Sequence, residues 1–260
     1  MSTLSAAAPA PFPVTVHPFK SPTPYSCAYE QGSSSSKNAL VFIGGLGDGP
    51  HTVPYVHRVA KELESSTKLS YSVFETRLRS SFGGFGYRRL QDDAADISAL
   101  VKYLHGIGKQ KVVLMGHSTG CQDCVEYADA TKYSNEPVDG FILQATVSDR
   151  EAIRPLMSKE AYEEGIEYAS NLIKSGKENE IMPRSKLPKE FDTPISAYRW
   201  FSLAGRGGDD DFFSSDLSDA EVEAVWSRFK QPANLKNGKA IVLQESQASS
   251  LASFLEQHTT

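Results

Sequence analysis

The residues best suited to chemistry form one pentapeptide, Gly116-His117-Ser118-Thr119-Gly120, directly after the apolar run 112–115. A strand that runs into G-x-S-x-G is the sequence form of a nucleophile elbow, a turn so tight that the residues flanking the serine must be small. In such a turn Ser118 attacks an acyl carbon, and the backbone N–H of Thr119 donates to the oxyanion that forms. A helix-compatible segment, 121–128, follows at once, which favours the elbow over a chance glycine-rich turn.

A second glycine-rich loop, residues 44–49 (Gly-Gly-Leu-Gly-Asp-Gly), follows the apolar run 39–43. It lacks the Lys-Ser/Thr pair of a phosphate-binding P-loop and the glycine spacing of a dinucleotide fingerprint. Glycines let a backbone bend so that an N–H can face the serine, which predicts the other half of an oxyanion hole here. The N–H of Leu46 is the predicted donor, with Gly45 as the neighbouring alternative.

The elements that must position these residues alternate between strand and helix patterns from residue 14 to residue 147. Repeated alternation indicates an α/β fold with a mostly parallel sheet and crossover helices. Strands are predicted at 14–19, 25–30, 39–43, 71–76, 112–115 and 138–145, and helices at 53–63, 90–106 and 121–128. The intervening loop 77–89 is basic and aromatic and is predicted to be flexible; it either binds substrate or merely crosses the surface.

The alternation stops after residue 147. Residues 148–217 have helix and loop patterns without a strand, the clearest helix being 158–174 with Ser158 as its cap and Gly176 as its end. We expect this insertion to be a helical lid over the serine. The acidic triplet 209–211 could bind a cation, but an isolated triplet is more often a solvated loop. The predicted organisation is a flexible tail (1–13), an α/β core (14–147), the lid (148–217) and the remainder of the core (218–260).

Composition excludes several classes of function. A net charge of −5 without a basic block argues against a nucleic-acid partner, and no apolar run approaches the roughly 18 residues of a membrane span. The first 13 residues lack the features of a signal peptide, and three cysteines suggest reduced thiols, so we expect a cytoplasmic protein. Cys121 and Cys124 have no second ligand pair, so neither a metal nor a cofactor is predicted. Nothing indicates an oligomeric state.

Together, these motifs resemble the α/β-hydrolase fold. More narrowly, the chain resembles the fungal and plant serine hydrolases that include the fungal siderophore (fusarinine-type) esterases, over roughly residues 12–229. The matching stretches are 42–49, 116–120 with Gln122-Asp123, Arg199-Trp200 and the Asp-rich 208–219. The resemblance implies hydrolysis, inside the cell, of a small-molecule carboxylic ester, with siderophore-type esters as the candidate substrates. Ser118 would form the acyl-enzyme while the Leu46 and Thr119 N–H groups hold the oxyanion.

The proton-transfer partners are harder to assign. In this fold the triad runs Ser, then Asp or Glu, then His. His117 is held in the turn and is expected to be structural. Four histidines, His17, His51, His57 and His105, precede the serine, and this chain order excludes them as ordinary triad partners. His258 follows the predicted last helix, 247–257, and we expect it not to reach Ser118. Glu245 could serve as the acid, but then nothing supplies the base.

The end of the chain offers one predicted strand, 239–244, where a complete hydrolase of this fold would have two. We therefore expect one late strand, with its acid-bearing loop, to be lacking. Two hypotheses follow: a serine carboxylic-ester hydrolase, or a catalytically impaired relative that only binds small acyl compounds.

Overall fold

The centre of the molecule is one twisted sheet. The computed structural model describes the chain except residues 1–9, 67, 231–234, 236–239 and 244–260. In that part the sheet has seven strands in the order β1-β2-β4-β3-β5-β6-β7. They are β1 (Thr15–Pro18), β2 (Cys27–Gln31), β3 (Asn38–Ile43), β4 (Tyr71–Thr76), β5 (Val112–His117), β6 (Gly140–Gln144) and β7 (Ala240–Leu243).

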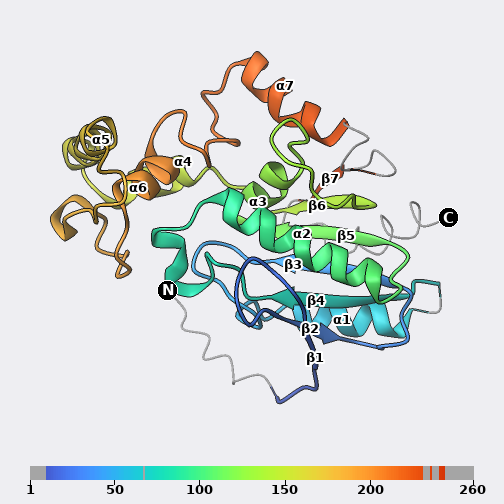
Figure 1. Cartoon of the computed structure of the whole chain (residues 1–260). Helices are drawn as coiled ribbons and strands as arrows, with labels where there is room; N and C mark the ends of the chain where they lie inside the picture. The colour runs from blue at the N-terminus through green and yellow to red at the C-terminus, as the bar shows by residue number, and fades with distance from the viewer. Residues whose placement is uncertain (1–9, 67, 231–234, 236–239, 244–260) are drawn as a thin grey trace, which may run out of the picture.

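In the spatial order given, the strands β4, β3, β5, β6 and β7 pair in parallel. The strands β1 and β2 add an antiparallel edge next to β4 (Figure 1). The predicted strands are confirmed, with ends that differ by at most two residues. The further late strand and the closing helix 247–257 concern residues outside the described part.

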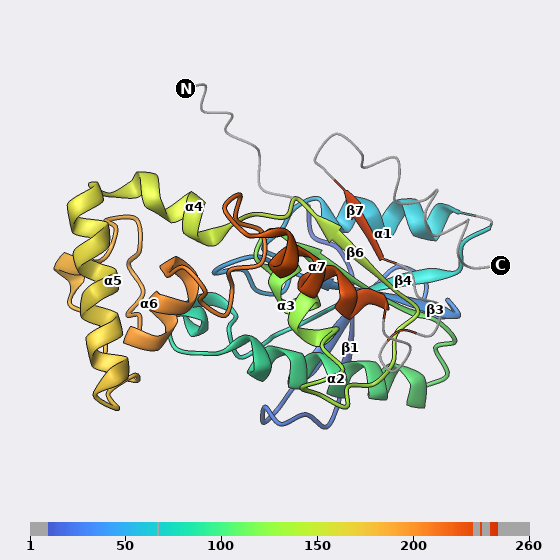
Figure 2. The ribbon, with the colours of Figure 1, turned by 90° about the horizontal axis from the view of Figure 1, so that it is seen from above.

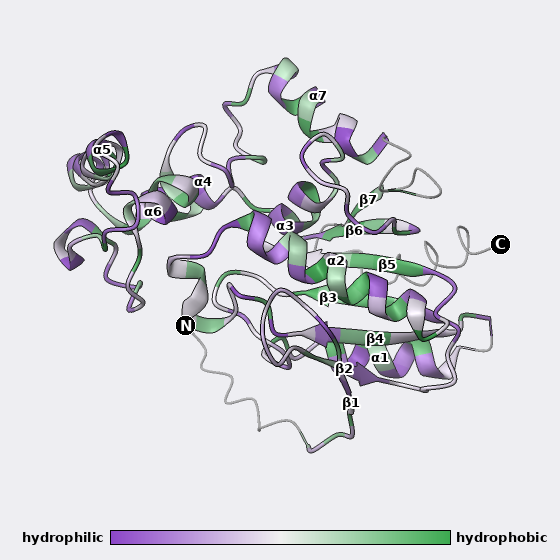
Figure 3. Ribbon diagram, in the orientation of Figure 1, coloured by the Kyte–Doolittle hydropathy of each residue, from purple (hydrophilic) through white to green (hydrophobic). Residues whose placement is uncertain are grey.

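Helices cover both faces of the sheet. Helix α1 (Val56–Ser65) lies on one side, while α2 (Leu90–Gly106) and α3 (Gly120–Tyr127) lie on the other (Figure 2). Along β3 the buried side chains alternate between two hydrophobic clusters, with Val41 facing α2 and α3 and Leu40 facing α1. Because both faces are covered, the central strands are continuously apolar (Figure 3), which is why they are recognisable in the sequence.

Residues 148–217 are called the cap segment below. The part from Ile153 to Ala204 packs around a third hydrophobic cluster that contains the fully buried Trp200. The segment contains α4 (Asp149–Ile153), α5 (Lys159–Lys174) and α6 (Ala197–Ala204), and α7 (Asp219–Ser227) follows it. The predicted caps are present, because Ser158 accepts from the Ala161 N–H and Ser218 forms a capping box with Glu221. The segment projects beyond the sheet beside the turn that follows β4 (Figures 1 and 2).

That turn corrects one prediction. Residues 77–89, expected to be a flexible loop, contain a 3₁₀ helix, η1 (Phe82–Gly86), in which Phe85 is buried against the cap segment. A Cβ atom on Gly86 would overlap the carbonyl oxygen of Pro194, and the Ser196 N–H donates to the Gly86 carbonyl. The segment is therefore a packed joint between the core and the cap segment.

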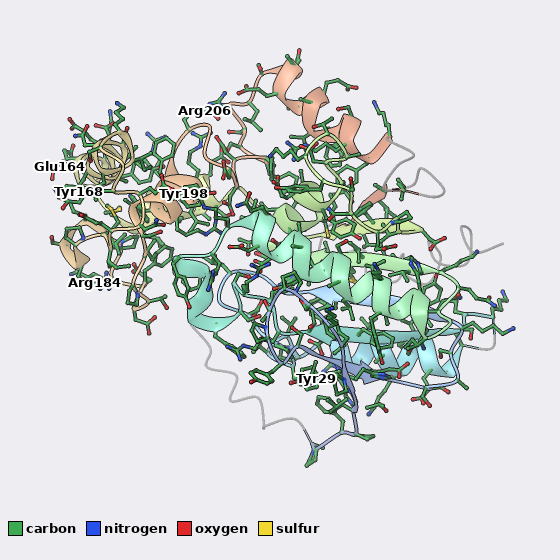
Figure 4. The ribbon with its side chains drawn as sticks, viewed as in Figure 1. Tyr29, Glu164, Tyr168, Arg184, Tyr198 and Arg206 are labelled. Carbon is green, nitrogen blue, oxygen red and sulfur yellow. The ribbon has the colours of Figure 1, made fainter. Side chains whose placement is uncertain are left out.

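The acidic triplet 209–211 corrects another prediction. Asp210 is buried and accepts two hydrogen bonds from the guanidinium of Arg199, and the equally buried side chain of Asp211 pairs with Arg150. Asp209 accepts from the Tyr198 hydroxyl, on the α6 side of the cap segment (Figure 4). The solvated-loop interpretation is therefore wrong for Asp210 and Asp211, whereas Asp209 is exposed. No group of three or more His, Cys, Asp and Glu side chains in the described residues is arranged for a metal ion.

Arg199 ties the cap segment to the core. Its side chain is 5% exposed, and besides pairing with Asp210 it donates from Nε to the Phe85 carbonyl at 2.9 Å.

In the described part of the chain we find no helix that combines the length and the apolar character of a membrane span.

Replacing Arg199 with Ala should leave Asp210 buried without its cation. Breaking one side of a buried ion pair typically costs about 3–5 kcal/mol, so we expect a loss of that size in chemical denaturation. Arg206→Ala is the matched control, because Arg206 is exposed on the cap segment (Figure 4) and its nearest partner, Glu221, is exposed too. The buried Asp211 would keep its pair with Arg150, so stability should hardly change. Equal effects of the two substitutions would contradict the stabilising role of the buried pair between Arg199 and Asp210.

Candidate active site

Ser118 occupies a strained turn between a strand and a helix. β5 ends at His117, α3 begins at Gly120, and Ser118 between them has a φ of +52°. The left-handed region is unfavourable for a non-glycine residue, so such a conformation persists only where its surroundings hold it. Here the Ser118 N–H donates to the Gln144 carbonyl at 3.0 Å, and the Ser118 carbonyl accepts from the Cys121 N–H at 3.0 Å.

The glycines on either side of Ser118 permit a close approach of two backbones. A Cβ atom on Gly116 would overlap the backbone of Gly120. A Cβ atom on Gly120 would in turn overlap the carbonyl oxygens of Ile43 and Gly44, at the end of β3. The start of α3 is therefore packed directly against the loop after β3, and this brings the two glycine-rich motifs together.

That loop is rigidly shaped by Asp48. The Asp48 carboxylate accepts from the Gly45 N–H at 2.8 Å and from the Thr52 hydroxyl at 2.8 Å. A Cβ atom on Gly45 would lie 3.0 Å from the Cβ of Ser118, so the loop touches the serine. The Gly45 N–H, the alternative oxyanion donor, is thus already engaged.

The two predicted oxyanion donors, the N–H groups of Leu46 and Thr119, are not engaged in this way. Across the described residues, neither the Leu46 N–H nor the Thr119 N–H has a hydrogen-bond acceptor. Both residues line one pocket, together with Gly44, Gly45 and Gly47. Two unpaired N–H groups on either side of a serine can stabilise an alkoxide, which is the chemistry of an oxyanion hole. Their catalytic role stays a prediction.

The histidines are engaged elsewhere. His117 contacts the Gln144 side-chain oxygen through Nδ1 and stacks on Phe42, and Tyr55 donates to the same oxygen at 3.0 Å. This makes His117 a structural residue. In the part of the chain that the structure describes, no histidine forms a hydrogen bond with Ser118. His258 and Glu245 lie outside the described residues.

The cysteines of the C-x-x-C pair are packing residues of α3. Both are fully buried, and burial raises the pKa of each thiol well above its usual range. The Cys121 thiol donates to the Gly116 carbonyl at 3.3 Å. A buried thiol with a raised pKa is a weak nucleophile and a weak metal ligand.

Sequence reasoning missed a group of buried carboxylates beside the pocket, called the acid cluster below: Asp93, Asp123, Asp149 and Asp210, around Arg199. Burial raises the pKa of Asp93 to about 6 and raises those of Asp123 and Asp149 well above their usual range. Mutual repulsion adds to the effect of burial. The only signals were Gln122-Asp123 and the Asp-rich stretch 208–219, which carried the resemblance without indicating burial.

Comparison with known proteins settles the family. The model of a family described as "Protein of unknown function (DUF1749)" matches residues 4–257. The chain belongs to this family. A UPF0613 protein of Schizosaccharomyces pombe is 36% identical over 206 residues, which cover 76% of this chain and 64% of that protein. The chain therefore spans less than two thirds of that relative.

Two further similarities bear on the fold and the activity. A protein of Aspergillus fumigatus named fusarinine C esterase is 28% identical over 89% of this chain and 76% of its own length. The solved structure of the siderophore hydrolase EstB from Aspergillus fumigatus superposes with a TM-score of 0.71 at 28% identity, covering 88% of this chain and 76% of that one. The shared architecture is the α/β-hydrolase fold, which confirms the predicted fold class and the resemblance to siderophore esterases.

Gly120→Ala tests the close approach that builds the site. The added methyl would collide with the Ile43 and Gly44 carbonyls, and overpacking of this kind costs about 1–3 kcal/mol. Gly106→Ala is the matched control, because nothing lies within 4 Å of a Cβ atom there. Thermal denaturation should show a lowered midpoint for Gly120→Ala only; an unchanged midpoint would mean that the two backbones are not in contact.

Proposed function

We propose that the chain is a serine hydrolase of carboxylic esters that acts through an acyl-enzyme on Ser118. One observation carries the proposal: a serine at a φ of +52° between a strand and a helix touches a glycine loop whose Leu46 N–H, like that of Thr119, has no acceptor in the described residues. Structural strain of this kind is typical of functional sites. The named activities of the Aspergillus relatives support the same reaction class.

The reaction follows from this geometry. Ser118 Oγ attacks the acyl carbon, and the carbonyl oxygen becomes an oxyanion that accepts from the Leu46 and Thr119 N–H groups. Collapse of this intermediate breaks the bond to the alcohol, which leaves with the proton that Ser118 lost, and water then hydrolyses the acyl-serine. The donors belong to different strand ends, and the backbone contacts described above fix them before the substrate arrives.

For the substrate we propose a small-molecule ester of the siderophore type. The support is the activity named for two Aspergillus proteins that are each 28% identical to this chain. We propose that the cap segment is the lid of the site, because Leu46 packs against the hydrophobic cluster of this segment. The three free cysteines favour a cytoplasmic location.

A second candidate is a protein that binds small acyl compounds without turning them over. It is favoured by the position of His117, whose Nδ1 faces Gln144, and by the engagement of the other described histidines in pairs away from Ser118. Without a base a serine hydroxyl is a poor nucleophile, and removing the base of such a triad lowers turnover by several orders of magnitude.

Labelling with a fluorophosphonate probe separates the two candidates, because the probe reacts only with an activated serine. We expect covalent labelling of the wild type and of Ser227→Ala, a matched control on the exposed side of α7, and none of Ser118→Ala. Mass spectrometry of the intact chain measures the adduct. Folded wild-type protein that stays unlabelled would leave only the binding function.

Asp48→Ala tests whether the glycine loop must be held in place. Without the carboxylate, the Gly45 N–H loses its acceptor and the neighbouring Leu46 N–H loses its fixed direction. Loss of one oxyanion donor lowers rates by about 10²–10³-fold, and a displaced donor should cost at least about tenfold in the labelling rate. Glu62→Ala, an exposed carboxylate on α1, should label at the wild-type rate. Equal rates for both variants would argue against a role for the loop.

A further inference from the structure

Phe82 has a backbone conformation that a bulky residue does not favour. Its φ is +57°, in the left-handed region, although Gly83 and Gly84, which reach that region without strain, follow directly. A residue keeps such a conformation only where its surroundings hold it, and strain of this kind is typical of functional sites. Burial of the side chain is a weak reason for it, because Phe82 is 49% exposed. The reason lies in what its backbone and its ring contact.

Both parts of Phe82 contact the glycine-rich loop after β3. The Phe82 N–H donates to the Asp48 carbonyl at 3.0 Å. The tip of the ring occupies the space beside Gly49, because a Cβ atom added to Gly49 would overlap it. Two consecutive loop residues are therefore held by one residue of η1.

Asp48 and Gly45 close a tight turn that contains Leu46. The Asp48 N–H donates to the Gly45 carbonyl at 3.0 Å, and the Asp48 carboxylate accepts from the Gly45 N–H at 2.8 Å. Gly47 supplies the φ of +80° that the third position of such a turn requires. This turn sets the direction of the Leu46 N–H, so a displacement of Asp48 would change that direction.

The same 3₁₀ helix is attached to the cap segment. Phe85, three residues after Phe82, has its ring beside Gly47, where an added Cβ atom would lie 3.7 Å from it. The Phe85 carbonyl accepts from Arg199 of the cap segment. η1 thus contacts the turn through two aromatic rings and contacts the cap segment through its backbone.

We propose that Phe82 is a positioning residue of the esterase, which holds the turn 45–48 so that the Leu46 N–H points to the oxyanion. The proposal rests on the proposed function, because only a reaction at Ser118 gives this N–H an oxyanion to bind. A donor fixed in advance stabilises the transition state without reorganising when the charge forms. The strained backbone of Phe82 belongs to this preorganisation, and its ring beside Gly49 keeps the strained residue in place.

Phe82→Ala removes the ring, and the reaction of Ser118 with a fluorophosphonate measures the consequence. A misdirected donor weakens the transition state and leaves the bound probe unaffected. We therefore expect the maximum labelling rate to fall at least about tenfold, with the half-saturating probe concentration within about twofold of the wild type. Tyr87→Ala is the matched control, because Tyr87 is an aromatic residue of the same segment with 53% exposure, and it should label at the wild-type rate. A wild-type rate in Phe82→Ala, or a loss confined to the half-saturating concentration, would overturn the proposal.

Gly49→Ala tests the contact from the other side. The new methyl group takes the place of the ring tip, so this variant should slow labelling in the same way as Phe82→Ala. In the Phe82→Ala background it should have no further effect, because the three atoms nearest to the added Cβ all belong to the Phe82 ring. Losses that multiply in the double variant would mean that the two residues do not act through one contact, which would overturn the proposal.

Hydrogen exchange examines the turn without any reaction at Ser118. The Gly45 and Asp48 amides are both hydrogen-bonded within the turn. In Phe82→Ala we expect both to exchange at least about tenfold faster, while the amides of β3 keep the wild-type rate, as measured by mass spectrometry of peptides. Unchanged exchange of the turn, or an equal increase in β3, would overturn the proposal. If the wild type is not labelled at all, the proposed esterase fails, and hydrogen exchange alone decides whether Phe82 holds the turn.

Discussion

The contact between the start of α3 and the end of β3 is the constraint on which the rest of the site depends. Gly120 lies so close to the Ile43 and Gly44 carbonyls that no side chain fits between them. This contact turns the chain sharply after β5, forces Ser118 to a φ of +52° and brings it against Gly45. A looser packing would relax the serine and separate the Leu46 and Thr119 N–H groups. The strain at Ser118 is offset by the hydrophobic burial of the whole sheet.

The core could be predicted from the sequence because its signals are local. A strand buried on both faces is a continuous apolar run, and β4 (Tyr71–Thr76) matches its predicted range to the residue. The caps of α5 and α7 involve residues only three positions apart, such as Ser218 and Glu221. The elbow is likewise recognisable because its small residues are adjacent in the chain, although what Ser118 does stays a prediction.

The failures concern charges whose environment is set by distant residues. An acidic triplet has the same local pattern whether water or a guanidinium faces it, and only the fold brings Arg199 to Asp210. The segment 77–89 looked flexible because its glycines suggested conformational freedom. In the structure, Gly86 lets the backbone of Pro194 come close and Gly84 lets the backbone of Arg79 come close. Burial of Asp123 could not be predicted either, because every residue of α3 is buried, its polar residues included, and the helix has no side that faces solvent.

The acid cluster and the oxyanion donors share one wall, and this has a consequence for the chemistry. Negative charge near an oxyanion opposes its formation, so carboxylates beside Thr119 would slow acyl transfer unless they are neutralised. Burial already favours the neutral form of Asp123. On the proposed esterase mechanism, the Leu46 and Thr119 N–H groups stabilise an oxyanion only when the neighbouring carboxyls carry no net negative charge. A neutral Asp123 and the ion pair of Arg199 with Asp210 both meet this condition, so on that mechanism Arg199 would serve the reaction as well as the attachment of the cap segment.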